Sequence, residues 1–375
     1  MRQSHRDLGF FFEDRHNQLA ERLPAVAEAL TGQGDAGAIA ASLGAEHDLY
    51  RLLADETGVD LRAVCLVREV LGYVSPLADS IFAVHGLGTH PIVLAGSEAQ
   101  KVDYLDRCRA GASVGAFALT EPEAGSDVAS MQTVADKDGD GFRLRGTKTF
   151  ISNAGIASHY VVFANADPEG GRDGISAFLV PHDADGLRIE EFELGFEHPI
   201  GTLHFDGCAV PKSAVLGELG TGFKLAMRTL DAFRVSVGAA AVGMAGRALD
   251  EAANHVRNRQ QFGKPLSYQP IVQSHLADMA TELDAARLLV FRAAHAKDTL
   301  ERRVSTEAAM AKLYATEAAQ RIIDTAVQLH GGLGVKTGVV VEELYRAIRP
   351  LRIYEGTSEI QRLIIGRAVA KGEGR

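Results

Sequence analysis

The chain of 375 residues carries 39 lysines and arginines against 49 aspartates and glutamates, which gives a formal net charge of -10. An acidic chain without a basic tail or stripe is a poor match for the phosphates of nucleic acid, so DNA or RNA binding is excluded as a main function. The length exceeds what one hydrophobic core usually organises, and two or three packed units are expected.

The three cysteines are too scattered for a zinc site or a disulfide framework, and we expect them to be reduced and buried: Cys65, Cys108 and Cys208. The first twelve residues lack the charged and apolar regions of a signal peptide. The least charged helical stretch, residues 235–246, is too short and too rich in glycine and alanine to span a bilayer. The sequence therefore predicts a cytoplasmic protein without membrane insertion.

Helical periodicity dominates the chain from residue 15 to about residue 110. In its first stretch, apolar residues recur at helical spacing: Leu19, Leu23, Val26, Ala27 and Leu30. We expect a short loop at 32–37 and a break in the helix at 86–91, where glycines and a proline interrupt an apolar run. Residues 1–114 are assigned to a helical N-terminal domain.

Short β-favouring runs follow, separated by Asp-Gly and Pro-containing turns: residues 142–144, 159–164, 175–180 and 203–205. They lie too close together for intervening helices, which excludes a parallel dinucleotide-binding sheet. Residues 115–219 are therefore predicted to form a small antiparallel β domain.

Three long helical segments occupy the C-terminal part of the chain: residues 223–258, 268–298 and 306–330. Helices of this length joined by short loops pack as four-helix bundles, and residues 220–375 are assigned to such a bundle. The predicted fold class is α+β, mostly α.

A single carboxylate, Glu355, precedes the last predicted helix. Ser358 and Gln361 have the spacing of a capping box, which places Glu355 at a helix N-terminus, where the helix dipole favours its anion. The neighbouring Ile353 and Tyr354 indicate a partly apolar setting, which would raise its pKa. Such a carboxylate could act as a base near neutral pH, or it could merely neutralise the dipole of a surface helix.

Four other segments combine glycine, hydroxyl, aromatic and cationic side chains: ALTEPEAGSDVAS at 118–130, KTFISNAG at 148–155, RNRQQFG at 257–263 and QLHGGLG at 328–334. Backbone N–H groups with a hydroxyl suit a phosphate, and an aromatic face beside a hydroxyl suits a planar ring. Two arginines at a helix end suit an anion. Each segment also has a purely structural explanation. In chain order, these are an ordinary turn, an aromatic residue packed in the core, compensation of a helix dipole, and a helix cap.

Together with IYEGTSEIQRL at 353–363, these segments resemble the acyl-CoA dehydrogenases in content, order and spacing. The resemblance covers nearly the whole chain. It implies a helical N-terminal domain, a central β domain and a C-terminal four-helix bundle. It also implies FAD as the cofactor and a homotetramer, built as a dimer of dimers.

The resemblance implies which residues contact FAD. The β domain would supply Phe117, Leu119, Thr120, Gly125, Ser126, Phe150, Ile151 and Ser152. The bundle would reach the FAD of a neighbouring subunit with Arg259, Gln261, Phe262, Gln328, Gly331 and Gly332, while Thr357 and Glu359 match positions near the FAD phosphates and adenosine. Many members have tryptophan at the position of Phe150.

The reaction implied is dehydrogenation of an acyl-CoA to the trans-2-enoyl-CoA. Glu355 would remove the α-proton, the β-hydrogen would leave as hydride to the flavin, and the electrons would pass to an electron-transfer flavoprotein. Some branches of the family carry the base at the position of Phe233, which cannot accept a proton. Substrate contacts are implied for Ser126, Asp231, Arg234 and Gly356.

Three alternatives stay open: a dehydrogenase of a carrier-protein-bound acyl group, an oxidase that uses oxygen directly, and a non-catalytic relative that binds flavin or acyl-CoA. The acyl group is open as well. The segment EHPIGTLHFDGCAVP at 197–211 is similar to the corresponding segment of family members that act on alicyclic or aromatic-derived acyl-CoAs. Straight acyl groups of short or medium length are equally compatible with the sequence.

Overall fold

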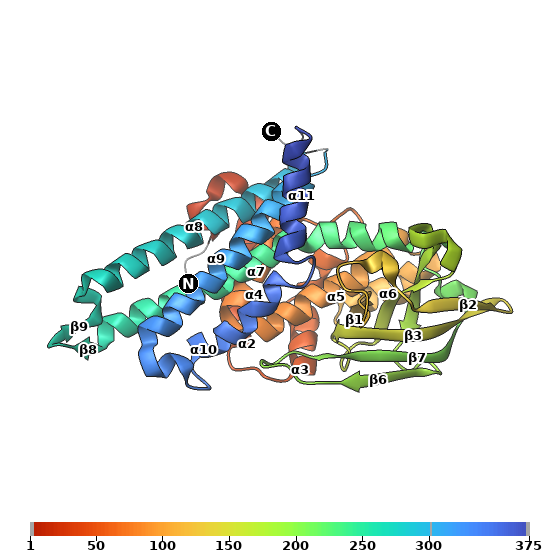
Figure 1. Cartoon of the computed structure of the whole chain (residues 1–375), viewed down its shortest axis with the longest axis horizontal. Helices are drawn as coiled ribbons and strands as arrows, with labels where there is room; N and C mark the ends of the chain where they lie inside the picture. The colour runs from red at the N-terminus through yellow and green to blue at the C-terminus, as the bar shows by residue number, and fades with distance from the viewer. Residues whose placement is uncertain (1–3, 301, 373–375) are drawn as a thin grey trace. The chain divides into compact units, whose positions relative to one another are not determined.

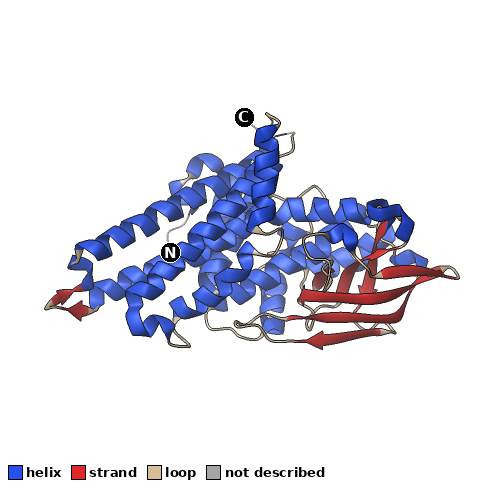
Figure 2. Ribbon diagram, in the orientation of Figure 1, coloured by secondary structure: helices blue, strands red, loops and turns tan. Residues whose placement is uncertain are grey.

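The computed structural model describes residues 4–300 and 302–372, and most of them are helical (Figures 1 and 2). The helices are α1 (Ser4–Asp7), α2 (Asp14–Leu30), α3 (Ala36–Ala41), α4 (Leu61–Val74), α5 (Pro76–Ala95), α6 (Glu98–Arg109), α7 (Gly222–Asn258), α8 (Pro270–Thr299), α9 (Ser305–His330), α10 (Val340–Ile348) and α11 (Ser358–Ala370). The strands are β1 (Gly115–Ala118), β2 (Val134–Asp138), β3 (Gly141–Ser152), β4 (His159–Asn165), β5 (Ile175–Pro181), β6 (Leu187–Glu191), β7 (Ile200–Val210), β8 (Gln260–Gln261) and β9 (Lys264–Pro265). The α+β, mostly α, fold class is confirmed.

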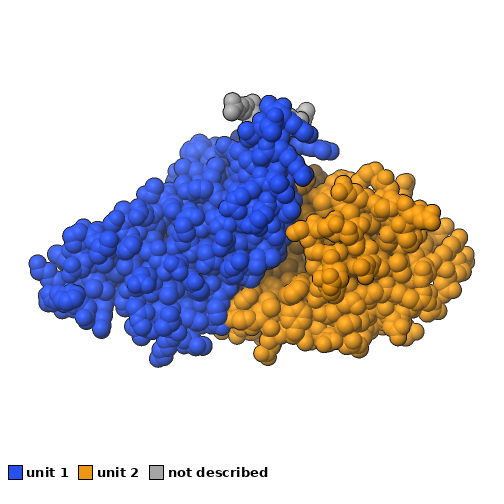
Figure 3. All heavy atoms as spheres, viewed as in Figure 1, with its two compact units in different colours: residues 1–31, 60–79, 233–375 blue, residues 32–59, 80–232 orange. Residues whose placement is uncertain are grey.

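The chain forms two compact units (Figure 3). Residues 1–31, 60–79 and 233–375 make up unit 1, and residues 32–59 and 80–232 make up unit 2. Helices α5 and α7 each contribute residues to both units. The three-domain division at residues 114 and 219 stays a prediction.

Unit 1 is built from long helices whose contact faces are rich in small residues. Helix α8 packs along α9, and α9 also packs against α10 and α11 (Figure 1). The buried small residues include Ala240 and Ala245 of α7, Ala294 of α8, and Ala311 and Ala315 of α9. Small side chains let helix axes approach closely and leave few voids. The three long helices predicted from periodicity are confirmed with ends within two residues.

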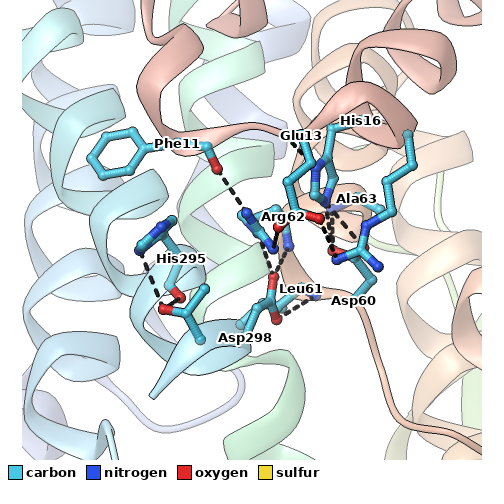
Figure 4. Close-up of polar contacts among 11 residues, drawn as sticks. Phe11, Glu13, His16, Asp60, Leu61, Arg62, Ala63, His295 and Asp298 are labelled. Carbon is cyan, nitrogen blue, oxygen red and sulfur yellow. Dashed lines mark hydrogen bonds and ion pairs between the residues drawn. The ribbon is translucent and has the colours of Figure 1, made fainter.

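A buried arginine ties the N-terminal segment of unit 1 to two helices (Figure 4). Arg62 donates to the carbonyl of Phe11 at 2.9 Å, to Glu13 Oε1 at 2.7 Å and to Asp298 Oδ2 at 3.0 Å. Asp298 of α8 also accepts the backbone N–H groups of Leu61 and Arg62, the first turn of α4. Because each donor of this cluster has an acceptor, the charges can be buried without leaving a hydrogen-bond donor unpaired.

Unit 2 contains a seven-stranded sheet with the order β1-β4-β2-β3-β7-β6 and with β5 beside β4. The four predicted runs are confirmed as β3, β4, β5 and β7, whereas β1, β2 and β6 were not predicted. Most pairs are antiparallel, but β1 pairs with β4 in parallel. The predicted antiparallel β domain is confirmed for most strand pairs, and the exceptions are the parallel pairs β1–β4 and β2–β4. Parallel pairing of β1 with β4 is possible because β2 and β3 intervene in sequence.

Strand β4 is buried on both faces, which explains its unbroken apolar run. Tyr160 and Val162 face one core, formed largely by the sheet itself. Val161 and Phe163 face a second core together with Ile92 of α5 and other helical residues. A strand covered on both sides loses the apolar-polar alternation that marks a half-exposed strand.

The helix break predicted at residues 86–91 is wrong, because α5 runs through it. A Cβ on Gly88 would lie 2.4 Å from the backbone nitrogen of Ala116, so glycine lets the helix approach β1 closely. Pro91 is accommodated inside the helix. Tertiary packing here outweighs the low helix propensity of glycine and proline.

The three cysteines are free and buried, as predicted. Among the helices of the described ranges, none is both long enough and apolar enough to cross a membrane.

Candidate active site

Glu355 lies on a tight turn between the helical turn Arg349–Arg352 and α11. Thr357, rather than Ser358, is the N-cap of α11, and its hydroxyl accepts the N–H of Ile360 at 3.3 Å. The predicted capping box of Ser358 and Gln361 is thus wrong. The Gln361 side chain instead donates to the carbonyl of Gly356 at 2.9 Å and to that of Glu355 at 3.4 Å.

Left-handed backbone conformations mark the segments that the sequence singled out. In the described chain, five non-glycine residues have positive φ: Asp48, Phe150, Asn153, Phe262 and Glu355. Three of them are predicted site residues, and Asn153 belongs to the KTFISNAG segment. A side chain in this region costs about 1–2 kcal/mol, so such conformations persist where the surroundings impose them, often at functional sites.

The Glu355 carboxylate is enclosed by unit 1. Its Oε2 atom is buried and has no hydrogen-bond partner within the described part of the chain. Burial raises the pKa of Glu355 above that of free glutamate, and the nearby positive charges of Arg68, Lys312 and Arg234 oppose this rise. The expected direction of the pKa shift is confirmed. A carboxylate held without a partner is ready to accept a proton.

Arg68 of α4 is held by a carboxylate of its own. Its Nε and Nη2 atoms donate to the two carboxylate oxygens of Asp79, both at 2.8 Å, and its Nη1 donates to Ser236 Oγ at 2.9 Å. Arg68 and Asp79 are each 1% exposed. The bidentate pair with Asp79 fixes the guanidinium near Glu355.

In unit 2, a buried ion pair holds the ALTEPEAGSDVAS segment. Glu121 accepts the N–H groups of Gln132 at 2.6 Å and Thr133 at 3.0 Å, and it pairs with Lys148 Nζ at 2.7 Å. Lys148 also donates to the carbonyl of Leu119. Burial lowers the pKa of Lys148 to about 8. The pair fixes the start of the loop, while Gly125 and Ser126 near its tip remain exposed.

A β-bulge turns Phe150 out of the sheet. The register of β3 against β7 shifts between Lys148 and Ile151, and Phe150 at this shift has φ +54° and is 62% exposed. The alternative that Phe150 packs into the core is therefore excluded. Bulges often re-aim side chains beside functional sites. Ile151 next to it is buried in the core of the sheet, so only its backbone is available to a ligand.

Ser152 has a partner that the sequence did not reveal. Its hydroxyl lies 2.7 Å from His198 Nε2. Burial lowers the pKa of His198 to about 4, so the imidazole is neutral at physiological pH. The serine hydroxyl therefore has a fixed neighbour, which restricts its rotation. Phe117 and Thr120 are half-buried at the edge of the same unit, and Leu119 is buried in its core.

The bundle segments come together in unit 1. Strands β8 and β9 form a hairpin whose turn residues, Phe262 and Gly263, both have positive φ, as type I′ turns require. Phe262 is 93% exposed. Helix α9 ends at His330 and its C-cap Gly331 has φ +60°, so the helix cap, one of the roles considered for these glycines, is present. An open pocket of about 340 Å³ is lined by Arg259 and His330, so the RNRQQFG and QLHGGLG segments meet there.

The remaining predicted residues are placed as follows. Gln261, Gln328, Gly331, Gly332 and Glu359 are exposed in unit 1, and Thr357 is half-buried at the start of α11. Asp231 and Arg234 lie one turn apart on α7, with Asp231 exposed and Arg234 buried. Gly356 follows Glu355 and has φ +88°.

Three sequence models for acyl-CoA dehydrogenases match the chain: the N-terminal domain at residues 20–112, the middle domain at 116–208 and the C-terminal domain at 220–370. The human mitochondrial short-chain specific acyl-CoA dehydrogenase is 44% identical over 312 residues, 82% of this chain and 76% of the relative. The chain belongs to the acyl-CoA dehydrogenase family. It is therefore an oxidoreductase of the acyl-CoA dehydrogenase type.

Two solved structures share the fold. The prolyl acyl carrier protein oxidase AnaB has a TM-score of 0.88 and 27% identity, covering 96% of this chain and 99% of that one. An acyl-CoA dehydrogenase from Bacillus anthracis, complexed with FAD, has a TM-score of 0.85 and 28% identity, covering 96% and 68%. FAD is the cofactor of this acyl-CoA dehydrogenase. In unit 2, the exposed Phe150 fits a planar ring, and the open space around Gly125 leaves room for a phosphate-bearing tail. In unit 1, Gly331 and Gly332 also border open space.

Sequence analysis did not reveal that Arg68 and Lys312 lie near Glu355 or that His198 contacts Ser152, and it gave Gln361 a capping role in place of its contacts with the turn. Arg68 and Lys312 lie outside the segments singled out above. For Lys312 a signal was present, since it occupies an otherwise apolar stripe of α9 between Ala308 and Ala315. A lone cation on an apolar helix face requires a buried partner.

Proposed function

We propose that this acyl-CoA dehydrogenase removes the α-proton and the β-hydrogen of an acyl-CoA thioester to give the trans-2-enoyl-CoA, with Glu355 as the base. The observation that carries the proposal is the Glu355 side chain on a strained turn, whose Oε2 atom is buried and has no hydrogen-bond partner among the described residues, with three cations nearby. Strained geometry and a perturbed carboxylate together are typical of a catalytic base. Phe233, at the alternative base position, is buried and cannot accept a proton.

The turn supplies a second group for the reaction. The backbone N–H of Glu355 makes no backbone hydrogen bond within the described residues. We place it at the thioester carbonyl, where it would stabilise the negative charge that develops as the α-proton leaves. Closure of the pocket by substrate would exclude water and strengthen both interactions. Asp231 and Arg234 on α7, with Ser126 and Gly356, would position the thioester and the CoA chain.

The cofactor would be held by the segments that the sequence singled out. Phe117, Thr120, Gly125 and Ser126 would contact the flavin, with Phe150 and Ser152 on its other side and Leu119 and Ile151 contributing backbone. Thr357 and Glu359 would lie near the FAD phosphates and adenosine, and the FAD of a neighbouring subunit would be reached by Arg259, Gln261, Phe262, Gln328, Gly331 and Gly332. When bound, FAD supplies the acceptor for the β-hydrogen.

We further propose a homotetramer in which the bundle segments reach the FAD of a neighbouring subunit. Phe262 at 93% and Val335 at 73% exposure belong to or adjoin these segments and are available to a neighbouring subunit. The domain boundaries at 114 and 219 are supported by the matched ranges. An electron-transfer flavoprotein would take the electrons. A cytoplasmic location is compatible with three free cysteines.

A carrier-protein substrate is the second candidate, and the similarity to a prolyl acyl carrier protein oxidase favours it. Product analysis separates the candidates. The holoenzyme is incubated with an artificial electron acceptor and with butyryl-, octanoyl- or cyclohexanecarboxyl groups attached either to CoA or to a pantetheine-bearing carrier protein. The proposal expects an enoyl product two hydrogens lighter from at least one CoA thioester. Turnover of carrier-protein thioesters alone would contradict it, and peroxide formed in air without the acceptor would identify an oxidase.

A further inference from the structure

The backbone conformation of the turn that carries Glu355 is unfavourable for its own residues. Glu355 and Gly356 are consecutive residues with φ values of +53° and +88°. Glycine adopts this region freely, whereas glutamate does not. The conformation that presents the carboxylate must therefore be imposed by the side chains packed around the turn.

Two buried side chains hold the carbonyl groups of this turn. Lys312 of α9 donates from Nζ to the carbonyls of Tyr354 at 2.8 Å and Gly356 at 2.5 Å. Gln361 of α11 donates to the carbonyls of Gly356 and Glu355. Both side chains are 0% exposed. The carbonyl before the base, its own carbonyl and the one after it are thus all held from inside unit 1.

Lys312 differs from the other fully buried lysine of the described chain. Lys148 makes an ion pair with Glu121 at 2.7 Å, whereas Lys312 has no carboxylate within ion-pair distance among the residues described. A buried ammonium bonded only to carbonyls needs a nearby negative charge to offset its desolvation. The negative charge that acts on it most strongly is that of Glu355.

We propose that Lys312 is the positioning residue of the base: it holds the left-handed turn through two carbonyl groups and places a positive charge near the Glu355 carboxylate. The proposal rests on the function assigned to Glu355 above and adds a second residue to it. Gln361 shares the mechanical role but carries no charge, which makes the two roles separable.

The charged groups around Glu355 come from four helices. Arg68 of α4, Lys312 of α9 and Arg234 of α7 lower its pKa, and Asp79 of α5 raises it. Removing Lys312 deletes one of three cations and should raise the pKa of the base further. Because the base must be deprotonated, the pH at which the reaction reaches half its maximal rate should then move upward.

The test compares Lys312→Met with Gln361→Met in the FAD-loaded enzyme. Each change removes donors to the same turn, but only the first removes a charge. Bleaching of the flavin by saturating acyl-CoA is followed by stopped flow from acid to alkaline pH. Amide hydrogen exchange of residues 354–361 is measured without substrate, as a readout that does not depend on activity.

Both variants should exchange faster in the turn and should react more slowly, by about 100-fold for Lys312→Met, since small displacements of a catalytic group are costly. Only Lys312→Met should shift the pH midpoint upward. Lys312→Gln, which keeps a donor without the charge, should show the same shift and serves if the methionine variant does not fold. An unchanged midpoint in the lysine variants, or unchanged exchange in the turn, would overturn the proposal. A wild-type enzyme that no thioester bleaches would instead contradict the proposed function.

Discussion

Replacing Glu355 by glutamine should abolish flavin bleaching by acyl-CoA while leaving FAD bound. Glutamine has nearly the shape of glutamate, so the strained turn and its hydrogen bonds to Lys312 and Gln361 should persist. It cannot accept the α-proton, and the rate should fall by about 10⁴-fold. Stopped-flow absorbance at saturating substrate gives the rate, and the visible spectrum after desalting reports the bound FAD.

A matched control is Glu343→Gln, which removes the same charge at an exposed site on α10. It should bleach at the wild-type rate. In the wild-type enzyme, burial raises the pKa of Glu355, so the rate should increase as the pH rises through that pKa. Bleaching by Glu355→Gln within tenfold of wild type would show that another group removes the proton.

Arg68→Met should cause the largest loss of stability among single changes near the site. The variant leaves Asp79 buried at 1% exposure without its bidentate partner, and an unpaired buried charge costs about 3–5 kcal/mol. The midpoint of urea unfolding, followed by circular dichroism, should fall accordingly.

The double variant Arg68→Met with Asp79→Leu provides the control. It removes both charges, so it should recover most of the stability that the single variant loses. Equal losses in the single and double variants would mean that the pair is not the cause. The double variant should still bleach more slowly than wild type, because the cation near Glu355 is gone.

Elements were predicted correctly from the sequence where the local residue pattern agrees with the way the element packs in the fold. The long helices α7, α8 and α9 carry uninterrupted helical periodicity, and the runs within β3, β4, β5 and β7 are rich in β-favouring residues. Strand β6 is short and partly exposed, so it carries little apolar signal. The prediction placed a break within helix α5 because Gly88 looked like a helix breaker. Gly88 instead allows close contact with β1, and a contact between distant parts of the chain is not encoded in the local pattern.

The site was predictable only where it lies in motifs. Glu355, Phe150 and Phe262 were singled out from their segments, whereas no local pattern indicated their positive φ angles. Lys312 is distant from the turn in sequence. It lies 43 residues before Glu355 and donates hydrogen bonds to the carbonyls of Tyr354 and Gly356. Such a contact depends on how α9 packs beside the turn, which spacing along the chain does not reveal.

The measurement that tests the central claim most directly is the visible spectrum of the purified protein under anaerobic titration with straight, branched and cyclic acyl-CoAs. We predict that the flavin absorbance bleaches on addition of at least one thioester and that the bleaching requires Glu355. A bound flavin that none of these thioesters bleaches would contradict the assignment of this chain as an acyl-CoA dehydrogenase with Glu355 as its base.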